Sequence, residues 1–545
     1  MKVKNAMADI LKREGVEFLI GYPRNPLLDA AAEVGIRTVI VRQERTGLHM
    51  ADAVSRVTSG EKIGVFTMQD GPGTENAFGG VAQAFSESVP IVVLPRGYAQ
   101  NVANTRPNFS ALLNFQHVTK WIEQPATPGS VLDALRRAFM QARNGRPGPA
   151  LVEVSRDLYE AEFAGPLTYA PARRVRTAPD PRDAAAAAEA LVTAQRPVIY
   201  AGQGVHYAKA WPQLQALAER LAAPVLTSLA GKSAFDESHP LALGAGGLTF
   251  SKQLHHFLTN ADFILGIGCS FSSTEFGVAM PAGKRVIHAT LDPSDLNKDL
   301  SSDFALIGDA ALTLDALLEE LAGRLADRRR DHSHAVAREV KTVKDAWLAE
   351  WQPELTSSST PLSPYRIIWD LMHTVDVANT VITHDSGNPR NQIVPFWESR
   401  TPLSYIGWGK STQLGYGLGL TLGAKLARPD KLCINVWGDA AVGFTGTDIE
   451  TAVRERLPIL SILFNNATMA TEHRTMPVAT EKFRATDIGG DYTAFARALG
   501  AHGERVSDPK DIIPAIKRGV GKTKEGVPAL IEFMTQRSSK RSAYR

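Results

Sequence analysis

Short apolar runs alternate with amphipathic helical patterns along most of this 545-residue chain. The runs are rich in Val, Ile and Leu, and they end at turns that contain glycine or polar residues. Strands buried on both faces of a parallel sheet have this continuous apolar pattern, and the helices between them supply the crossover connections. The pattern predicts strands at residues 38–42, 63–67, 91–94, 197–201, 224–227, 263–267, 286–291, 380–383, 432–437 and 459–464.

Two polar segments divide this pattern into three blocks. Residues 165–183 are rich in Pro, Ala and Arg, and residues 357–361 have the sequence SSSTP. The chain is also longer than one ordinary domain. We therefore predict an α/β protein of three consecutive doubly wound parallel-sheet domains, at residues 1–165, 184–325 and 360–535.

Composition narrows the range of partners. The chain has 60 basic and 57 acidic residues, a balance that gives no reason to expect nucleic acid or a membrane surface. No apolar run is long enough to span a bilayer, and the N-terminal stretch lacks a secretory apolar core. Cys269 and Cys433 each lie inside an apolar run and are expected to be buried free thiols. We predict a cytoplasmic protein.

Polar residues follow two neighbouring strands of the third block. Asp439 comes after the strand at 432–437, Asn466 comes after the strand at 459–464, and a helical pattern separates them. Parallel strands have their carboxyl ends at one edge of the sheet, so these side chains should converge. Carboxylate and amide oxygens suit Mg²⁺, and the amides at the start of the following helix could hold a phosphate. The structural alternative is a turn-forming aspartate and a helix-capping asparagine.

This segment resembles the signature of thiamine-diphosphate enzymes, in which Gly-Asp-Gly is followed roughly 25–30 residues later by Asn-Asn. The resemblance implies that Asp439, Asn466 and the backbone carbonyl of Thr468 bind Mg²⁺. Ala440 stands where the family has glycine, and its methyl group could crowd the diphosphate. The residues that the resemblance places around the diphosphate are Gly438, Asp439, Ala440 and Ala441, with Ser386, Gly387 and Asn388 from a second loop.

Glu44 follows the strand at 38–42 and begins a helical pattern. A glutamate at a helix start also has a purely structural explanation, because it complements the helix dipole. The stretch Arg42-Gln43-Glu44 resembles the Arg-His-Glu stretch of acetolactate synthases, with Gln43 in place of histidine. In that family the glutamate hydrogen-bonds N1′ of the aminopyrimidine, which helps its amino group to remove the C2 proton of the thiazolium. The resemblance implies a catalytic and cofactor-binding role for Glu44.

Three further segments resemble cofactor loops of the family. In the sequence GKSTQLGYG, Leu414 takes the place of the bulky residue that bends the cofactor, unless it is simply a core leucine. The carbonyl of Thr412 and the amide of Leu414 would bind the pyrimidine. The turn at 70–76 contributes Asn76. The Tyr-Pro turn contributes Pro23, and Asn25 is expected beside the reacting carbon, whereas the role of Arg24 stays open.

The resemblance covers nearly the whole chain, in the order pyrimidine-binding, middle and diphosphate-binding domain. It implies a lyase or ligase that decarboxylates a 2-oxo acid and transfers the two-carbon or acyl unit to a second carbonyl. Glu472 aligns with a proton donor of simple 2-oxo acid decarboxylases, and with His473 it forms either a proton relay or an ordinary charged helix start. The alternatives are therefore a non-ligating decarboxylase, an enzyme that cleaves a diketone or an acyl-CoA, and a non-catalytic cofactor-binding paralogue.

The resemblance also implies the cofactors and partners. Thiamine diphosphate and Mg²⁺ are expected, with a small 2-oxo acid or related carbonyl compound as substrate. Acetolactate synthases often carry FAD, but residues 244–250 (GAGGLTF) depart from the family's Gly-Met-His-Gly stretch, so FAD is not expected. Glu44 and Asp439 lie in different domains, and the family's arrangement then places each site between two subunits. We expect at least a homodimer, and a homotetramer is common in the family.

Overall fold

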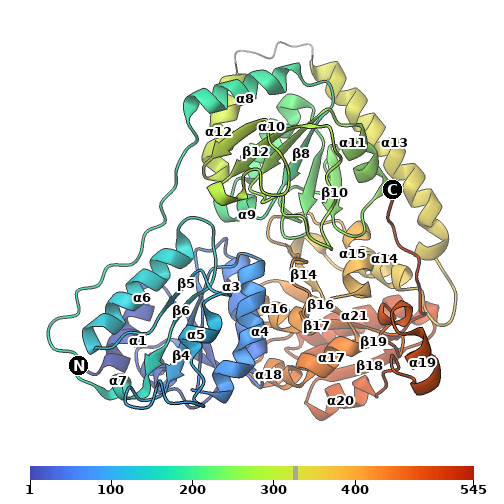
Figure 1. The fold of residues 1–545 in the computed structure, drawn as a ribbon. Helices are drawn as coiled ribbons and strands as arrows, with labels where there is room; N and C mark the ends of the chain where they lie inside the picture. The colour runs from blue at the N-terminus through green and yellow to red at the C-terminus, as the bar shows by residue number, and fades with distance from the viewer. Residues whose placement is uncertain (323–328, 545) are drawn as a thin grey trace.

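The computed structural model describes residues 1–322 and 329–544 of the chain. Three separate parallel β-sheets, each flanked by helices, lie in the N-terminal, central and C-terminal parts of the chain (Figure 1). This architecture confirms the predicted fold class. The domain boundary that we predicted at residue 325 lies outside the described residues. The predicted first linker, 165–183, contains an extended segment before α8 (Pro181–Thr193) begins.

The N-terminal sheet has the strand order β2-β1-β3-β4-β6-β5, with β7 paired to β4. Its strands are β1 (Phe18–Gly21), β2 (Arg37–Ile40), β3 (Gly64–Met68), β4 (Ile91–Gly97), β5 (Trp121–Glu123), β6 (Ala150–Val152) and β7 (Val154–Ser155). Its helices are α1 (Val3–Arg13), α2 (Leu27–Glu33), α3 (Glu44–Arg56), α4 (Pro72–Ser86), α5 (Ala111–Phe115), α6 (Pro128–Arg143) and α7 (Arg156–Glu160).

The C-terminal sheet has the order β15-β14-β16-β17-β19-β18. Its strands are β14 (Thr380–His384), β15 (Tyr405–Ile406), β16 (Leu432–Gly438), β17 (Leu460–Asn465), β18 (His502–Val506) and β19 (Ala529–Met534). Its helices are α14 (Pro364–Thr374), α15 (Asn388–Phe396), α16 (Tyr416–Ala427), α17 (Asp439–Thr445), α18 (Ile449–Arg454), α19 (Pro477–Phe483), α20 (Tyr492–Ala498) and α21 (Ile512–Lys524). Numbered within each domain, the N-terminal and C-terminal sheets therefore share the order 2-1-3-4-6-5.

The central sheet has a different order, 3-2-1-4-5-6, which is the order of dinucleotide-binding folds. Its strands are β8 (Pro197–Ala201), β9 (Val225–Ser228), β10 (Ala242–Gly246), β11 (Phe263–Ile267), β12 (Arg285–Thr290) and β13 (Phe304–Ile307). Besides α8, its helices are α9 (Gly204–Ala208), α10 (Trp211–Leu221), α11 (Lys252–Asn260) and α12 (Ala310–Leu321), and α13 (Arg329–Leu355) leads to the C-terminal domain.

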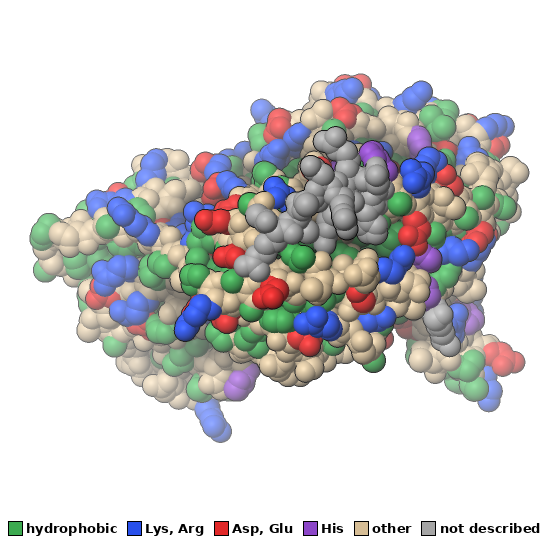
Figure 2. All heavy atoms as spheres, turned by 90° about the horizontal axis from the view of Figure 1, so that it is seen from above, with side chains coloured by type: hydrophobic (Ala, Val, Ile, Leu, Met, Phe, Trp, Pro, Cys, Tyr) green, Lys and Arg blue, Asp and Glu red, His purple; other side chains and the backbone are tan. Residues whose placement is uncertain are grey.

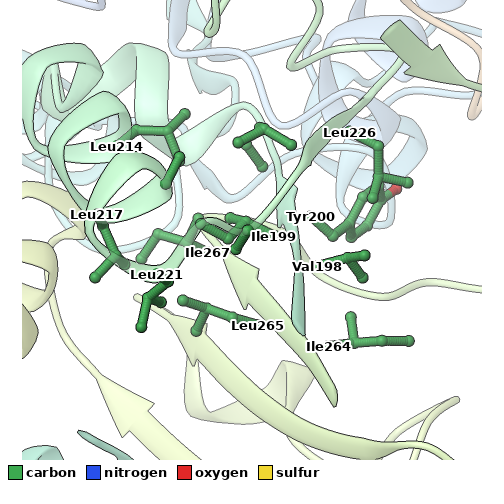
Figure 3. Close-up of a cluster of buried hydrophobic side chains, with 14 of the residues drawn as sticks. Val198, Ile199, Tyr200, Leu214, Leu217, Leu221, Leu226, Ile264, Leu265 and Ile267 are labelled. Atoms are coloured by element: carbon green, nitrogen blue, oxygen red, sulfur yellow. The ribbon is translucent and has the colours of Figure 1, made fainter. Parts of the chain in front are cut away.

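Alternate side chains of the central strands pack on opposite faces of the sheet (Figure 3). Leu214 and Leu217 of α10 lie on the same side as Ile199 and Ile267, whereas Val198 lies on the other side. Both faces are thus covered, which explains why β8 and β11 are apolar at successive positions. The two cysteines, Cys269 and Cys433, are buried free thiols, as predicted.

The N-terminal and C-terminal domains pack together through α3 and α16, which lie side by side (Figure 1). Gly423 allows the close approach, since a Cβ there would lie 2.2 Å from the carbonyl oxygen of Met50. A buried polar network crosses the contact: Tyr416 donates to Asp52 at 2.6 Å, and Arg56 donates to the carbonyl of Gly407 at 2.8 Å. The contact fixes the segment that joins β15 to α16 against the N-terminal domain.

The surface carries both signs of charge. Acidic and basic side chains are interspersed on the face viewed from above (Figure 2). Over the described ranges, no helix has the length and apolar character that crossing a membrane requires.

Candidate active site

Asp439 and the loop after β17 converge at one edge of the C-terminal sheet. Strands β16 and β17 are parallel neighbours, with Gly438 opposite Phe464. Asp439 is 4% exposed, and its Oδ1 accepts the backbone N–H of Ala440 at 2.9 Å. Burial raises the pKa of Asp439, while the N–H groups of Ala440 and of residues 466–468 oppose that rise. The predicted convergence of Asp439 with the Asn466 loop is therefore present in the fold.

The chemistry of this edge fits a magnesium ion. Asp439 Oδ2 is buried and has no hydrogen-bond partner within the described part of the chain. The half-buried Asn466 accepts the N–H of Thr468 at 3.2 Å, and the Thr468 hydroxyl is tied to the carbonyl of Thr486 at 3.0 Å. The described residues contain no group of three or more His, Cys, Asp or Glu side chains suited to a metal. A metal here would be held by one carboxylate and neutral oxygens, which is the pattern that Mg²⁺ accepts together with phosphate and water.

Asp385, which the sequence did not single out, organises the neighbouring loops. Its buried carboxylate accepts the N–H groups of Ser386 at 2.8 Å and of Gly415 and Gly417 at 3.0 Å. Burial raises the pKa of Asp385 to about 6. Asp385 thus joins the loop after β14 to the loop before α16. The Gly-x-Gly pattern at 415–417 is the signal that could have pointed to this partner, because a Cβ on Gly417 would lie 3.2 Å from Asp385 Oδ2.

The predicted diphosphate loop lies beside the metal edge. Ser386, Gly387 and Asn388 are half-buried, and Gly387 precedes α15 with a φ of 77°, a backbone conformation that favours glycine. A Cβ on Gly438 would lie 3.7 Å from the ring of Pro389, so the ends of β14 and β16 are close neighbours. The residues predicted around the diphosphate therefore belong to adjacent loops.

The segment that carries Thr412 and Leu414 is held between two domains. On one side, Gln83 of α4 donates to the carbonyl of Ser411 at 3.0 Å, and Gln413 donates to the carbonyl of Gly79 at 2.5 Å. On the other side, Thr445 donates to the carbonyl of Gly415 at 2.9 Å. Leu414 is half-buried and packs against the core, and Thr412 is also half-buried.

Glu44 lies in a cleft of about 740 Å³ at the start of α3. The side chain is 4% exposed, and its Oε2 accepts the amide N–H of Asn76 at 3.3 Å. Burial raises the pKa of Glu44. A Cβ on Gly73 would lie 3.1 Å from Glu44 Oε1, so glycine keeps this carboxyl accessible from α4. The structure therefore brings the predicted residues Glu44 and Asn76 together.

Within one chain the predicted residues form two groups. Residues that line the Glu44 cleft include Arg42, Glu44, Arg45, Asn76, Gly443 and Phe444. The C-terminal domain therefore contributes only the C-terminal end of α17 to this cleft. Asp439 lies at the opposite, N-terminal end of that helix. Asp439, Asn466, Thr412 and Leu414 do not line it.

Three family models match the chain. The "Thiamine pyrophosphate enzyme, N-terminal TPP binding domain" matches residues 1–117, the "central domain" matches 184–317, and the "C-terminal TPP binding domain" matches 385–533. The chain belongs to the thiamine pyrophosphate enzymes. It is a thiamine-diphosphate-dependent enzyme, and its three sheets correspond to the three domains of that family.

Relatives at low identity extend over nearly the whole chain. A "Probable acetolactate synthase large subunit" of Methanococcus aeolicus is 28% identical over 99% of this chain and 93% of its own length. "Acetolactate synthase isozyme 3 large subunit" of Escherichia coli (strain K12) is 27% identical over 92% and 88%. "Sulfoacetaldehyde acetyltransferase" of Alcaligenes xylosoxydans xylosoxydans is 28% identical over 98% and 93%. The chain is thus similar over nearly its whole length to acetolactate synthase large subunits and to a sulfoacetaldehyde acetyltransferase.

In this thiamine pyrophosphate enzyme, the side chain of Asn25 forms hydrogen bonds within the N-terminal domain. Its amide donates to the carbonyl of Met68 at 3.1 Å and to the Tyr159 hydroxyl at 3.3 Å, and its oxygen accepts the N–H of Leu27 at 3.0 Å. These contacts favour a structural role, and the catalytic role stays a prediction. Pro23 and Arg24 are exposed, and Arg24 has a φ of 85°, which costs a non-glycine residue roughly 1–2 kcal/mol.

Glu472 lies on the segment that follows the proposed metal loop. It is half-buried in a short 3₁₀ turn, Glu472–Arg474, and accepts the hydroxyl of Thr471 at 2.6 Å. His473 is exposed. The proton relay between Glu472 and His473 stays a prediction.

A second and larger cavity, of about 790 Å³, opens at the central domain. It lies at the carboxyl ends of β8, β11 and β12 and reaches the C-terminal domain at Lys410. Gly246, Gly247, Leu248 and Phe250, from the segment that departs from the family's FAD stretch, also line it. The volume is that of a small-molecule or cofactor site. That FAD is not bound stays a prediction, which the visible absorption spectrum of the purified protein tests.

Proposed function

We propose that this enzyme, with thiamine diphosphate and Mg²⁺, decarboxylates a 2-oxo acid and transfers the remaining acyl unit to a second carbonyl compound. The observation that carries the proposal is the buried Asp439 carboxylate, which lies beside the Asn466 loop at adjoining strand ends and whose Oδ2 has no hydrogen-bond partner among the described residues. The names of two relatives, both acetolactate synthase large subunits, support the carboligase reaction. Thiamine diphosphate supplies a carbon nucleophile and a place to store the electron pair that decarboxylation releases.

Each group of residues has a proposed task. Asp439, Asn466 and the Thr468 carbonyl hold the metal, and through it the diphosphate. Glu44 holds N1′ of the pyrimidine, and its burial, which raises the pKa of the carboxyl, favours the protonated form that this contact needs. The loop residues that would surround the cofactor are Pro23, Asn76, Ser386, Gly387, Asn388, Thr412, Leu414, Gly438, Ala440 and Ala441.

We propose that two copies of the chain complete each site. Within one chain, Asp439, Asn466, Thr412 and Leu414 do not line the Glu44 cleft. Large apolar side chains that line the Glu44 cleft are exposed, with Phe78 39% and Phe444 43% exposed. A second copy would cover these rings and bring its Asp439 group to Glu44. The assembly is then at least a homodimer, and it can associate further into a tetramer.

A second candidate concerns the acyl acceptor. One relative is named sulfoacetaldehyde acetyltransferase, so an enzyme that cleaves a carbon–carbon bond and transfers acetyl to an acceptor other than a 2-oxo acid is the runner-up. A non-ligating decarboxylase that uses Glu472 has less support, because this side chain is bonded to its neighbour Thr471.

The test is an incubation of the protein, thiamine diphosphate and Mg²⁺ with a panel of 2-oxo acids, with CO₂ and products followed by mass spectrometry. The proposal predicts CO₂ together with an acyloin or acetohydroxy acid. Aldehyde alone would favour the decarboxylase with Glu472 as proton donor. No CO₂ from any acid, with C2 hydrogen exchange of the cofactor intact, would favour the transferase, diketone or acyl-CoA reactions. No acceleration of C2 exchange would favour a non-catalytic paralogue.

A further inference from the structure

Asp448 is a buried carboxylate of the C-terminal domain that has no task in the proposed function. It is 0% exposed and lies in the short 3₁₀ turn Gly446–Asp448, at the N-cap position of α18. An aspartate in this position usually accepts a backbone N–H from the first turn of its own helix. Asp448 forms no such bond, so helix capping does not explain why a carboxylate is buried here.

The backbone partner of Asp448 is in the N-terminal domain, at the turn that leads to Glu44. Asp448 Oδ1 accepts the N–H of Arg42 at 2.8 Å and the hydroxyl of Thr451 at 2.8 Å. The pairing of β2 with β1 ends at Ile40, and α3 begins at Glu44. Asp448 therefore holds the main chain after β2 has ended and before α3 begins.

Two other contacts between the same segments are exposed to solvent. Arg454 of α18 donates to the carbonyl of Ile40 at 2.5 Å, and Arg37 of β2 forms an ion pair with Glu455 at 3.1 Å. Both arginines are exposed. Surface ion pairs contribute little to stability, whereas a hydrogen bond from a backbone N–H to a carboxylate is among the stronger ones. We therefore expect the buried carboxylate of Asp448 to contribute most to holding this turn.

The charge of Asp448 also acts on Glu44. Asp448 Oδ2 is buried and has no hydrogen-bond partner within the described ranges, and the guanidinium of Arg42 is paired with Glu450 at 3.9 Å. Burial raises the pKa of Asp448, and the N–H of Arg42 opposes that rise. Burial is also the main cause of the raised pKa of Glu44, and negative charge on Asp448 raises it further. Asp448 thus favours the protonated form of Glu44, which the proposed contact with N1′ needs.

We infer that Asp448 is a positioning residue for Glu44, whose helix start it fixes through the backbone N–H of Arg42. Asp448 does not line the Glu44 cleft, so it acts through the main chain and through its charge, and not by contact with the cofactor. The inference rests on the proposed role of Glu44. It also gives the C-terminal domain a second task, because the stretch from Asp439 to Asp448 would hold a metal at one end and orient a catalytic glutamate at the other.

Two substitutions separate the geometric action from the charge. Asp448→Asn keeps an oxygen that can accept the N–H of Arg42 but removes the charge, whereas Asp448→Ala removes both. At saturating thiamine diphosphate and Mg²⁺, Asp448→Ala should slow C2 hydrogen exchange of the cofactor about 10- to 100-fold, as expected when a reacting group is misplaced by about 1 Å. Asp448→Asn should restore most of this rate on the acidic side of the pH profile.

The pH profile of C2 exchange is the reading that a merely structural residue would not change. In our proposal this exchange needs protonated Glu44, so it declines as the pH rises through the pKa of Glu44. Removal of the negative charge of Asp448 lowers that pKa, and the decline should therefore move to lower pH with Asp448→Asn. The other charged side chains of the cleft, Arg42, Arg45 and Glu75, are the same in both proteins.

Amide hydrogen exchange tests the backbone contact without cofactor. Release of the N–H of Arg42 should speed amide exchange at residues 41–46 with Asp448→Ala, and less so with Asp448→Asn. Asp370→Ala is the matched control, because Asp370 is 6% exposed and pairs with Arg366 of its own helix, α14. This control should lower Tm, but it should leave the amide exchange at residues 41–46 and the rate and pH profile of C2 exchange unchanged.

Glu44→Gln distinguishes failure of the inference from failure of the proposed function. If Glu44→Gln slows C2 exchange but Asp448→Ala has a normal rate and Asp448→Asn an unchanged pH profile, the inference is wrong and the proposed function stands. If Glu44→Gln leaves C2 exchange unchanged, both are wrong. An equal loss with Asp370→Ala and Asp448→Ala would show a general effect on folding and would also overturn the inference. If Asp448→Ala does not fold, the pH profile of Asp448→Asn decides.

Discussion

The N-terminal and C-terminal sheets share one strand order, but the residues that follow corresponding strands have different proposed roles. In the N-terminal domain, the second strand leads to Glu44, the proposed partner of the pyrimidine. In the C-terminal domain, the second strand leads to the Thr412 and Leu414 segment, and the third and fourth strands lead to Asp439 and Asn466. Under our proposal, the sheet edge of the N-terminal domain contacts one end of the cofactor, and the equivalent edge of the C-terminal domain contacts both ends.

The aspartates after the third strand show how this difference arises. Asp70, after β3, forms an ion pair with Arg96 at 2.8 Å. Asp439, after β16, has an oxygen without a hydrogen-bond partner among the residues that the structure describes, and burial raises its pKa. A carboxylate paired with a cationic side chain stabilises a turn, whereas a buried carboxylate without such an ion pair favours a metal cation. The topology determines where the residues lie, and the local counter-charge determines what they can bind.

The largest expected effect is on cofactor affinity, and it should differ between substitutions of these two aspartates. Asp439→Ala should weaken the Mg²⁺-dependent binding of thiamine diphosphate at least about 100-fold, which corresponds to roughly 2.7 kcal/mol. Asp70→Ala is the matched control and should change this affinity little, because Arg96 already satisfies that carboxylate. Calorimetry with and without Mg²⁺ measures both. An undiminished affinity for Asp439→Ala would remove the metal assignment.

The second-largest expected effect distinguishes cofactor binding from catalysis at Glu44 of the N-terminal domain. Glu44→Gln should retain cofactor affinity but slow C2 hydrogen exchange roughly 100- to 10,000-fold, the range for loss of an acid–base group. Glu75→Gln serves as control, since Glu75 lines the same cleft but is exposed. If Glu44→Gln lost only cofactor affinity, the catalytic role would be wrong.

A smaller effect is expected from the residue that positions the C-terminal loops. Asp385→Asn keeps the shape but cannot accept all three backbone N–H groups of Ser386, Gly415 and Gly417. We expect cofactor affinity to fall about 10- to 100-fold, as for other residues that orient ligating groups. Hydrogen exchange at residues 409–417 should rise in the same variant. Normal affinity with unchanged exchange would show that the two loops do not depend on Asp385.

The smallest effect concerns the departure from the family signature. Ala440→Gly removes the methyl group and should raise cofactor affinity up to about threefold, while glycine in a helix lowers the stability of the cofactor-free protein by roughly 0.5–1 kcal/mol. Cofactor titration and urea unfolding measure the two quantities separately. A weaker affinity would mean that the methyl group does not crowd the diphosphate.

Much of the fold could be predicted because the strands are buried on both faces. The predicted strands 197–201 and 263–267 agree with β8 and β11, whose residues are all buried. Strand β5 (Trp121–Glu123) was not predicted, because it is three half-buried residues with no apolar run. The sequence could not show that Asp385 accepts backbone N–H groups 30 positions away, nor that Asn25 is held by Met68 and Tyr159.

The central claim is that one site is formed by Glu44 of one copy and Asp439 of another. Two differently tagged chains, one with Glu44→Gln and one with Asp439→Ala, can be co-expressed and the mixed dimer purified. One of its two sites would then contain both substitutions, and the other would contain neither. The account predicts that C2 hydrogen exchange of thiamine diphosphate, which needs no substrate, recovers to about half the rate of the unmodified dimer, because one site of two is intact. If each site formed within a single chain, every site would carry one substitution, and exchange as slow as in the separate variants would contradict the claim.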